Sequence, residues 1–396
     1  MYAQVLREER FGEPIDALRQ EIIDTPEITA DECLVAVMAT GINYNGIWAG
    51  YGRPVNVIEG HRRRGDQRGY HVAGSEASGI VYEVGSRVES VKVGDAVVLH
   101  GGWWDTQCPR IRAGEDPMLT PTHLVWGYET NDGSFGQFAR VKAHQVLPKP
   151  AHLTWEEAAV YTVNGGAAYR GLFGFSEHSV RPGDVVLVWG GAGGLGSLAI
   201  QLVVAAGGRP VAVVSDDDKA EFCRALGAVG VINRKRFDHW GVLPDWRDDS
   251  AYRQWLAGAR AFGAELWRVL GERRNPRLVF EHPGESTIPT SCFVCAEGGM
   301  VVICAGTTGY TASLDLRRHW MRQKRLQGTH GANAEQYRAF NDMIASGAVD
   351  PCLSRTFRFE EMPEAHQLMH SGKHPYGNMA ALVGASELGR GREDEP

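Results

Sequence analysis

Strand-like and helix-like apolar segments alternate along the chain from about residue 165. Val185–Trp189 is an apolar run of strand length, and Ser197–Ala206 is helix-like and ends at Gly207-Gly208. Further strands are predicted at 210–215, 230–233, 278–281 and 299–304, with a helix at 219–226. Such alternation predicts a parallel, doubly wound sheet.

Residues 1 to about 160 have a different pattern. Short apolar runs at 33–38, 79–84 and 95–99 are separated by Gly, Asp and Ser turns, which is typical of a β-rich domain. A helix-like segment at 335–346 and short strands after it are expected to rejoin this domain. The fold class is therefore α/β, with one domain formed by 1–164 and 334–396 and a second by 165–333. Residues 234–275 read as a largely exposed helical insertion, and the polar tail 387–396 as frayed.

Composition narrows the class of protein. The chain has 396 residues, of which 43% are hydrophobic and 22% charged, as in an ordinary soluble protein of two domains. The net charge of −7 gives no sign of a nucleic-acid partner. No apolar run approaches the roughly 18–20 residues of a membrane span, and the N-terminus has no signal-peptide pattern. Seven scattered cysteines indicate reduced thiols and a cytoplasmic protein, and Cys292-x-x-Cys295 reads as a pair of packing cysteines.

A glycine motif follows the first strand of the alternating region. Gly191-Ala192-Gly193-Gly194-Leu195-Gly196 stands between a predicted strand and a predicted helix, the setting in which GxGxxG binds a dinucleotide. Gly191 is expected to allow the tight turn, Gly193 to let the backbone approach a pyrophosphate, and Gly196 to let helix and strand pack closely. The alternative is a purely structural glycine turn.

The residues after the second strand bear on the choice of cofactor. Ser215 and Lys219 suit the 2′-phosphate of NADPH, whereas the charge of Asp216 would repel it. We therefore expect NADPH. Asp216–Asp218 can also be read as a solvated helix N-terminus, where carboxylates are favourable. Gly306 and Thr307, after the strand at 299–304, are further expected cofactor contacts.

The order of the two domains resembles the medium-chain dehydrogenase/reductase superfamily, which implies a GroES-like domain and a Rossmann domain. Zinc-containing members have a cysteine in the first lobe, a Gly-His-Glu segment and a four-cysteine lobe. Here the corresponding segments are 41–45, without cysteine, and Gly74-Ser75-Glu76, with serine in place of histidine. These positions cannot supply the N and S ligands that zinc needs. We expect no metal, and hydride addition to an activated C=C bond.

Several segments resemble one branch of that superfamily, the crotonyl-CoA carboxylase/reductases. Those that match most specifically are Trp-Gly-Tyr-Glu-Thr at 126–130 and Phe-Glu-His-Pro-Gly at 280–284. The others are 43–48, 70–75, 147–150, 153–159, 279–284, 320–325 and 328–330. Together they span roughly residues 33 to 360.

The resemblance implies reductive carboxylation without biotin. NADPH would deliver hydride to the β-carbon of an enoyl-CoA such as crotonyl-CoA, and the enolate would attack CO2 to give an alkylmalonyl-CoA. The family's CO2 pocket maps to Asn45, Tyr128, Glu129 and His330, with Asn43 as a rival for the asparagine role. The amide of Asn45 and the imidazole of His330 can donate to CO2 oxygens.

Coenzyme A carries phosphates, so basic residues are expected along its path. Arg317, Arg318, Arg322, Lys324 and Arg325 form such a cluster, of which Arg322, Lys324 and Arg325 are the predicted substrate-binding residues. The alternative is the solvated face of a helix. The basic run His61–Arg64 with Arg68 reads as a solvated loop, or as a contact to an anionic group or another subunit. The expected partners are the enoyl-CoA, CO2 and further copies of the chain, as a dimer or tetramer.

Two other functions stay open. A plain enoyl-CoA or enoyl-thioester reductase would protonate the enolate instead of carboxylating it. A nucleotide-binding protein of the quinone-reductase type would bind NADPH without turnover. The presence of Asn45, Glu129 and His330 favours the carboxylase over both.

Overall fold

The computed structural model describes residues 1–392, which form two compact units. The first unit comprises residues 1–166 and the segment from 331 onward, and the second comprises 167–330. One boundary falls inside helix α6 (Thr162–Phe173) and the other at His330/Gly331. The boundaries expected from the sequence were 164/165 and 333/334.

A seven-stranded sheet organises the first unit around β3 (Glu32–Ile42). The strand order is β10-β6-β5-β3-β18-β17, with β9 also paired to β3. One edge of β3 pairs with β5, while its other edge is shared by β9 along Glu32–Ala36 and by β18 along Ala39–Ile42. The pairing of β18 with β3 confirms that the segment after 331 rejoins the first domain. The other strands of this sheet are β5 (Ala77–Val84), β6 (Ala96–Leu99), β9 (Phe138–Lys142), β10 (Val146–Pro148), β17 (Leu353–Phe357) and β18 (Asn378–Leu382).

Two smaller sheets and several short helices complete this unit. The sheets have the orders β2-β1-β4 and β7-β8. Their strands are β1 (Tyr2–Leu6), β2 (Arg19–Ile22), β4 (His71–Val72), β7 (Gly102–Trp103) and β8 (Leu124–Val125). The helices are α1 (Pro14–Ala17), α2 (Tyr44–Tyr51), α3 (Val57–Arg63), α4 (Pro109–Arg112), α5 (Trp155–Ala158), α12 (Ala334–Ala345) and α13 (Met362–His370).

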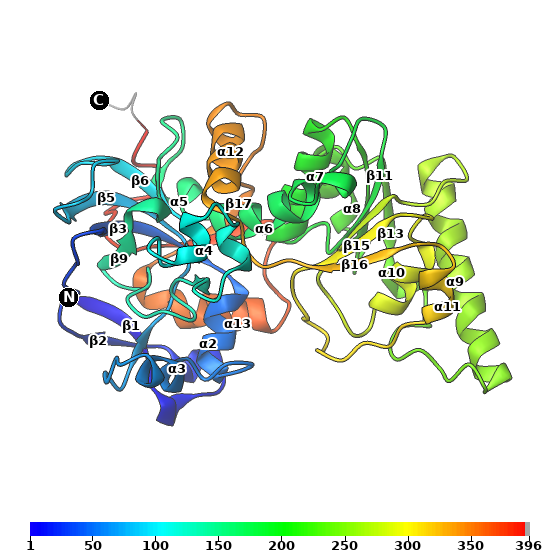
Figure 1. Cartoon of the computed structure of the whole chain (residues 1–396), viewed down its shortest axis with the longest axis horizontal. Coiled ribbons are helices and arrows are strands. Elements are labelled where there is room, and N and C mark those ends of the chain that lie inside the picture. Colours follow the sequence, from blue (N-terminus) through cyan, green and yellow to red (C-terminus); the bar gives the residue numbers. More distant parts are fainter. Residues whose placement is uncertain (393–396) are drawn as a thin grey trace. The chain divides into compact units, whose positions relative to one another are not determined.

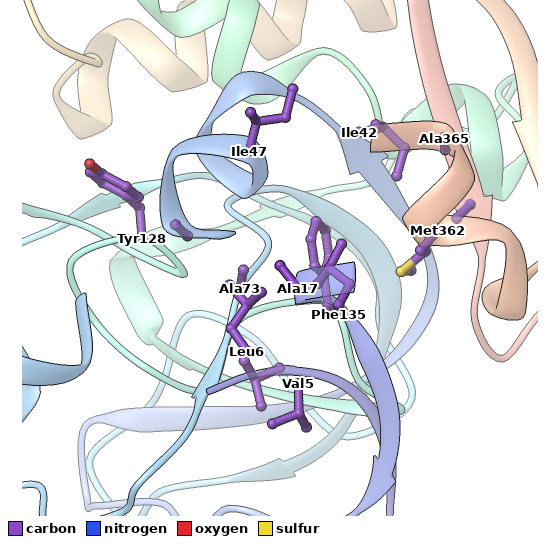
Figure 2. Packing of buried hydrophobic residues seen from close by; sticks show 14 of the residues in the cluster. Val5, Leu6, Ala17, Ile42, Ile47, Ala73, Tyr128, Phe135, Met362 and Ala365 are labelled. Carbon is purple, nitrogen blue, oxygen red and sulfur yellow. The ribbon is translucent and has the colours of Figure 1, made fainter. Parts of the chain in front are cut away.

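An apolar core fixes α2 in the first unit. Ile47, on α2, is buried in one cluster with Leu6 of β1, Phe135 and Met362 of α13. Tyr128 belongs to the same cluster and lies beside the helix that carries Ile47 (Figure 2). Burying such side chains stabilises each by roughly 1.5–3 kcal/mol relative to exposure. The core therefore holds α2 and the turn at Tyr128 in place together.

The second unit contains the predicted parallel sheet, with the strand order β13-β12-β11-β14-β15-β16. Its strands β11, β13, β15 and β16 are labelled in Figure 1. All neighbours in the sheet are parallel. Every residue of β11 is buried, as expected for a strand covered on both faces. The strands are β11 (Val185–Trp189), β12 (Arg209–Val214), β13 (Gly230–Asn233), β14 (Leu278–Glu281), β15 (Met300–Ile303) and β16 (Arg325–Gly328).

Helices cover both faces of this sheet. Ile200 of α7 (Gly194–Ala205) and Cys223 of α8 (Lys219–Ala225) lie on the face that Ala212 occupies. The opposite face packs Val211 and Val213 against α9 (Asp249–Leu270) and α10 (Ile288–Val294). One further helix, α11 (Leu316–Trp320), precedes β16. The doubly wound arrangement predicted from the sequence is confirmed.

The insertion at 234–275 differs from the prediction. It is helical, as expected, but α9 is not largely exposed, because its apolar residues recur at helical spacing and face the sheet. Phe262 is fully buried, stacks on Trp189 with ring centroids 5.8 Å apart and shares the core with Leu266. The sequence interpretation was wrong because the charged residues of α9 lie on the opposite face of the helix from its buried apolar residues.

The tail also differs from the prediction over its described part. Residues 389–392 are tied to α5, because Gly389 N donates to Glu156 Oε1 at 2.7 Å and Trp155 N donates to the carbonyl of Arg390 at 2.9 Å. Arg392 lies 3.4 Å from Glu157. Residues 393–396 lie outside the described part of the chain.

Two sequence expectations concern the thiols and the membrane. Cys292 and Cys295 are buried, and burial raises the pKa of each thiol to about 12, so both act as packing cysteines as expected.

Within residues 1–392, no helix combines the length and apolar character needed to cross a bilayer.

Candidate functional site

The N-terminal turn of α2 fixes the position of Asn45. Asn43 is the N-cap, and its side-chain carbonyl accepts the backbone N–H of Asn45 at 3.1 Å. The amide Nδ2 of Asn45 donates to Ser75 Oγ at 3.1 Å. The structure thus gives Asn43 a capping role, and Asn45 is the asparagine whose side-chain amide meets Ser75.

Ser75 stands where the sequence comparison with zinc-containing dehydrogenases places a histidine. It is fully buried, and its hydroxyl accepts a hydrogen bond from Asn45 rather than lying among metal ligands. In the described residues, no group of three or more His, Cys, Asp or Glu side chains could hold a metal ion. The Ser75 hydroxyl at this position therefore orients the side-chain amide of Asn45.

The turn carrying Tyr128 and Glu129 lies against the same segment. A Cβ added to Gly127 would stand 1.9 Å from the carbonyl oxygen of Gly74, so glycine is required where the two backbones touch. Glu129 Oε2 accepts the backbone N–H of Val125 at 2.9 Å and closes its own turn. Tyr128 is 6% exposed. The turn therefore joins Tyr128 and Glu129 to the segment that contacts Asn45.

The basic run at 61–68 supports this turn from its other side. Arg64 donates to the backbone carbonyl of Glu129. Arg68 bridges Asp66 at 2.6 Å and the fully buried Asp132 at 2.7 Å. Burial would raise the pKa of Asp66, but the hydrogen bonds from Arg68 hold it well below its usual range. Arg62, Arg63 and Arg64 are exposed, as expected of a solvated segment, and Arg64 and Arg68 also support the turn, a role that the sequence analysis did not assign.

The glycine motif forms a cradle at the end of β11. The left-handed residue of the turn is Gly190, with φ of 59°, and not Gly191 as expected. Gly191 is needed for packing instead, because a Cβ there would stand 2.7 Å from Ala212 Cβ. A Cβ on Gly196 would stand 2.2 Å from the carbonyl oxygen of Gly190, which confirms its predicted role in close packing.

Gly193 is the position that fits a bound dinucleotide. It is the N-cap of α7 and makes no side-chain cap hydrogen bond. A Cβ there would meet nothing nearer than the carbonyl oxygen of Gly190 at 3.4 Å, so the protein's own packing does not demand glycine. The first turn of α7, which includes Gly194 and Leu195, offers backbone N–H groups and the positive end of the helix dipole. These features fit a pyrophosphate.

The end of β12 carries the predicted selectivity residues. Lys219 Nζ donates to Ser215 Oγ at 2.7 Å, and Ser215 Oγ donates to Asp216 Oδ2 at 3.0 Å. Lys235, from the turn after the neighbouring strand β13, pairs with Asp216 at 2.5 Å. Its hydrogen bond is the largest cause that lowers the pKa of Asp216. Sequence reasoning missed Lys235, although the basic tripeptide 234–236 directly follows the third strand of the dinucleotide fold.

A buried carboxyl network lies at the end of β14, the strand next to β11. Glu281 accepts from Thr287 Oγ1 at 2.6 Å and from Ser291 Oγ at 2.5 Å, and Ser291 accepts from the indole N–H of Trp189 at 2.8 Å. Burial raises the pKa of Glu281 to about 7. A Cβ on Gly190 would meet His282 Nε2 at 2.3 Å. His282, which follows the anchored Glu281, therefore packs against Gly190 in the cradle turn, a contact that the sequence analysis did not anticipate.

Gly306 and Thr307 lie next to this network. Thr307 N donates to the carbonyl of His282 at 3.3 Å, and a Cβ on Gly306 would stand 2.9 Å from the carbonyl of Gly309. Their place beside the β14 loop is in keeping with a cofactor contact, which stays a prediction.

The remaining predicted residues lie near the end of the second unit. Arg322 pairs with Glu297 at 2.9 Å, and Arg325 donates to Gln327 at 2.7 Å. Lys324 Nζ donates to the carbonyl of Cys292 at 2.7 Å, at the C-terminal end of α10, and burial lowers its pKa. His330 is the last residue of the unit.

Comparisons with known proteins agree with this geometry. The alcohol dehydrogenase GroES-like domain family matches residues 29–151, and the zinc-binding dehydrogenase family matches 194–346. These matches confirm the expected GroES-like and Rossmann-type domains.

Three relatives are informative. A crotonyl-CoA carboxylase/reductase of Cereibacter sphaeroides is 51% identical over 98% of this chain and 89% of its own. The structure of the crotonyl-CoA carboxylase/reductase AntE in complex with NADP has a TM-score of 0.95 and 54% identity, covering 98% of this chain and 95% of that one. The 2-octenoyl-CoA carboxylase reductase CinF, solved with NADP and 2-octenoyl-CoA, has a TM-score of 0.90 and 38% identity, covering 99% and 90%. The chain belongs to the crotonyl-CoA carboxylase/reductase family.

Proposed function

We propose that this protein catalyses the NADPH-dependent reductive carboxylation of an α,β-unsaturated acyl-CoA to an alkylmalonyl-CoA. The observation that carries the proposal is the Asn45–Ser75 pair, in which a hydroxyl holds an amide at the position where zinc-containing relatives have histidine. An amide held in this way can donate to a CO2 oxygen and cannot polarise a substrate as zinc does. Relatives with this activity in their names match nearly the whole chain.

In the proposed reaction, bound NADPH supplies a hydride to the β-carbon of the enoyl thioester. The π electrons of the C=C bond then move onto the thioester as an enolate, whose α-carbon forms a new bond to the carbon of CO2. Asn45 Nδ2 and the imidazole of His330 donate to the CO2 oxygens, and these hydrogen bonds strengthen as the carboxylate forms. Glu129 keeps its turn closed, and Tyr128 excludes water, whose protons would quench the enolate.

We assign cofactor binding to the second unit. The cradle residues Gly191, Gly193, Gly194, Leu195 and Gly196 receive the pyrophosphate, and Ser215 with Lys219 receives the 2′-phosphate. Gly306 and Thr307 contribute backbone groups. The exposed guanidinium groups of Arg322 and Arg325 suit the phosphates of coenzyme A. Lys324, which caps α10, contributes less directly by holding the segment that carries them.

Product analysis tests the proposal. Purified protein is incubated with NADPH and crotonyl-CoA, with bicarbonate and carbonic anhydrase or in CO2-free buffer, and the acyl-CoA products are identified by mass spectrometry. We expect ethylmalonyl-CoA when CO2 is supplied. Butyryl-CoA as the sole product under saturating bicarbonate would establish a plain reductase, and NADPH binding without oxidation would establish a non-catalytic protein.

We also propose that the chain works as a homo-oligomer, a dimer or tetramer, in the cytoplasm. Large apolar side chains are exposed beside the sheet-edge strand β16, among them Trp320 at 61% and Met321 at 69%, which supports an interface. All seven cysteines are free thiols, as suits a reducing compartment. Light scattering coupled to size-exclusion chromatography tests the assembly, and a monomer at micromolar concentration would contradict it.

A further inference from the structure

Glu76 is a buried carboxyl group for which the proposed reaction has no use. It directly precedes β5, is 1% exposed, and its backbone carbonyl accepts from Thr40 Oγ1 at 3.0 Å and from Ser134 Oγ at 2.8 Å. Its side chain accepts hydrogen bonds from neutral donors only. An ionisable group kept in such a place needs a reason, because burying it is costly.

The two carboxyl oxygens of Glu76 face different elements. Oε2 accepts the backbone N–H of Val163, in the first turn of α6, at 2.8 Å. Oε1 accepts from Asn43 Nδ2 at 3.4 Å. A Cβ on Gly41 would stand 2.4 Å from Oε1, so glycine at that position makes room for the carboxyl group. Oε2 also accepts from Thr162 Oγ1 at 3.3 Å, so Glu76 presents one oxygen to α6 and the other to Asn43.

This arrangement determines which way the amide of Asn43 points. Because Nδ2 is directed at Glu76, Oδ1 is directed at the backbone N–H of Asn45, where it caps α2 at 3.1 Å. The residue before Glu76 is Ser75, which accepts from Asn45 Nδ2 at 3.1 Å. Both the main chain and the side chain of Asn45 are thus held by the Ser75-Glu76 segment, directly or through Asn43.

We propose that Glu76 is a positioning residue that fixes the Asn43 amide, and through it the orientation of Asn45. This inference rests on the proposed role of Asn45 in holding CO2. When one acceptor oxygen of Glu76 is removed, Asn43, Thr162 and Val163 compete for the other. Asn43 must then lose its bond to residue 76 or turn over and release the N-cap of α2. Either change moves the donor that faces CO2 and favours protonation of the enolate.

Reversal of the hydrogen-bond polarity tests this inference. In Glu76→Gln, the new side-chain oxygen can still accept the backbone N–H of Val163. The new side-chain NH2 group, however, faces the NH2 group of Asn43, and neither can accept from the other. In the double variant Asn43→Asp with Glu76→Gln, one Asp oxygen caps Asn45 N and the other accepts from the Gln amide, so every bond is restored with the same total charge. The single variant Asn43→Asp places two carboxylates against each other. The readouts are the ratio of carboxylated to reduced product in saturating bicarbonate, the KM values for NADPH and crotonyl-CoA, and the melting temperature.

We expect Glu76→Gln and Asn43→Asp to lower the product ratio about tenfold, in line with one lost hydrogen bond, and the double variant to return it to within about threefold of the wild type. Glu156→Gln is the matched control. Glu156 is 5% exposed and also accepts a backbone N–H, at 2.7 Å, but that N–H belongs to Gly389 in the C-terminal tail rather than to the segments around Asn45. It should lower the melting temperature without changing the product ratio.

The outcomes separate the alternatives. A Glu76→Gln variant that melts lower yet keeps the wild-type ratio overturns the inference and leaves a purely structural carboxyl. If Glu76→Gln does not fold, a folded double variant with a restored ratio supports the inference, and failure of both variants overturns it. A wild type that makes no carboxylated product overturns the proposed function, and the inference with it.

Discussion

At the scale of single residues, this structure distinguishes glycines that the packing of the protein requires from glycines that it does not require. Gly193 and Gly196 belong to one motif, yet the space around them differs. A Cβ on Gly196 would collide with the carbonyl of Gly190 at 2.2 Å, whereas a Cβ on Gly193 meets no atom nearer than 3.4 Å. The backbone of Gly193 has φ of −83°, which alanine tolerates.

This difference predicts opposite effects for two alanine variants. Gly193→Ala should keep the melting temperature of the cofactor-free protein near that of the wild type, while raising the Kd for NADP+ by about tenfold or more. Gly196→Ala should destabilise the cofactor-free protein, because helix α7 must move away from β11. Thermal melting with and without NADP+ measures both. Equal melting temperatures for the two apo variants would contradict the assignment.

A second prediction concerns Lys235. Lys235→Ala removes the cation that neutralises Asp216, so the uncovered carboxylate should repel the 2′-phosphate. We expect KM for NADPH to rise about 10-fold or more, with a much smaller change for NADH, and Lys219→Ala to act in the same direction. Arg236→Ala is the control, since Arg236 pairs with Asp217 at 3.0 Å on the same turn. If Arg236→Ala has the same effect, general charge rather than the Asp216 contact determines selectivity.

At the scale of elements, α9 shows how packing decides the role of a charged segment. Its N-cap Asp248 accepts from Ser250 N and Ala251 N, and Gly271 ends the helix with φ of 78°. Between these ends, buried residues recur at intervals of three or four and cover one face of the sheet. The helix is therefore part of the core of the second unit.

We expect Phe262→Ala to destabilise the second unit by about 3–5 kcal/mol, because a fully buried ring is replaced by a cavity. Urea unfolding followed by tryptophan fluorescence suits the measurement, since Phe262 stacks on Trp189. Arg260→Ala, on the exposed side of the same helix, should change stability by less than about 0.5 kcal/mol. Similar effects of the two changes would show that α9 contributes little to the core.

At the scale of the whole molecule, buried ionisable groups set how stability depends on pH. Burial raises the pKa of Glu76, in the first unit, and of Glu281, in the second, to about 7. Each carboxyl group stabilises the fold fully below its ordinary pKa of 4.5, and this contribution is lost as pH rises towards 7. Burial lowers the pKa of several histidines to about 4, so their contribution is present above 6.5 and is lost on acidification. These histidines are His61, His144, His282 and His366.

Glu281→Gln should therefore alter the pH dependence in a defined direction. The wild type loses stability on acidification from pH 7 to 5 through its histidines, while Glu281 partly offsets this loss by taking up a proton. The variant cannot take up that proton, so its stability should fall more steeply over the same range, with a difference of about 2 kcal/mol. Urea midpoints at pH 5, 6, 7 and 8 measure this. Parallel profiles for the two proteins would show that Glu281 is not protonated in the folded state.

The sequence by itself determined the elements and their class. The strands at 185–189, 230–233 and 278–281 have the bounds expected from the sequence pattern, and β11 and β14 are buried at every residue, as is typical of strands covered on both faces. The glycine motif, Ser75 and the family segments identified the cofactor fold and the family, since these depend on residue type at fixed spacing. The sequence also indicated Asn45 and Glu129 as site residues, whose roles stay predictions.

The tertiary structure alone decided which groups meet across long separations. The contacts of Lys235 with Asp216, of Arg64 with the Glu129 carbonyl, and of Glu76 with Asn43 and Val163 join residues 19 to 87 positions apart. No local sequence pattern predicts such contacts. They depend on the order of the strands in each sheet, on how the helices pack, and on the glycines at which two backbones can touch. The same reason explains why the exposure of α9 and the roles of Gly190 and Gly191 could be settled only once the chain was folded.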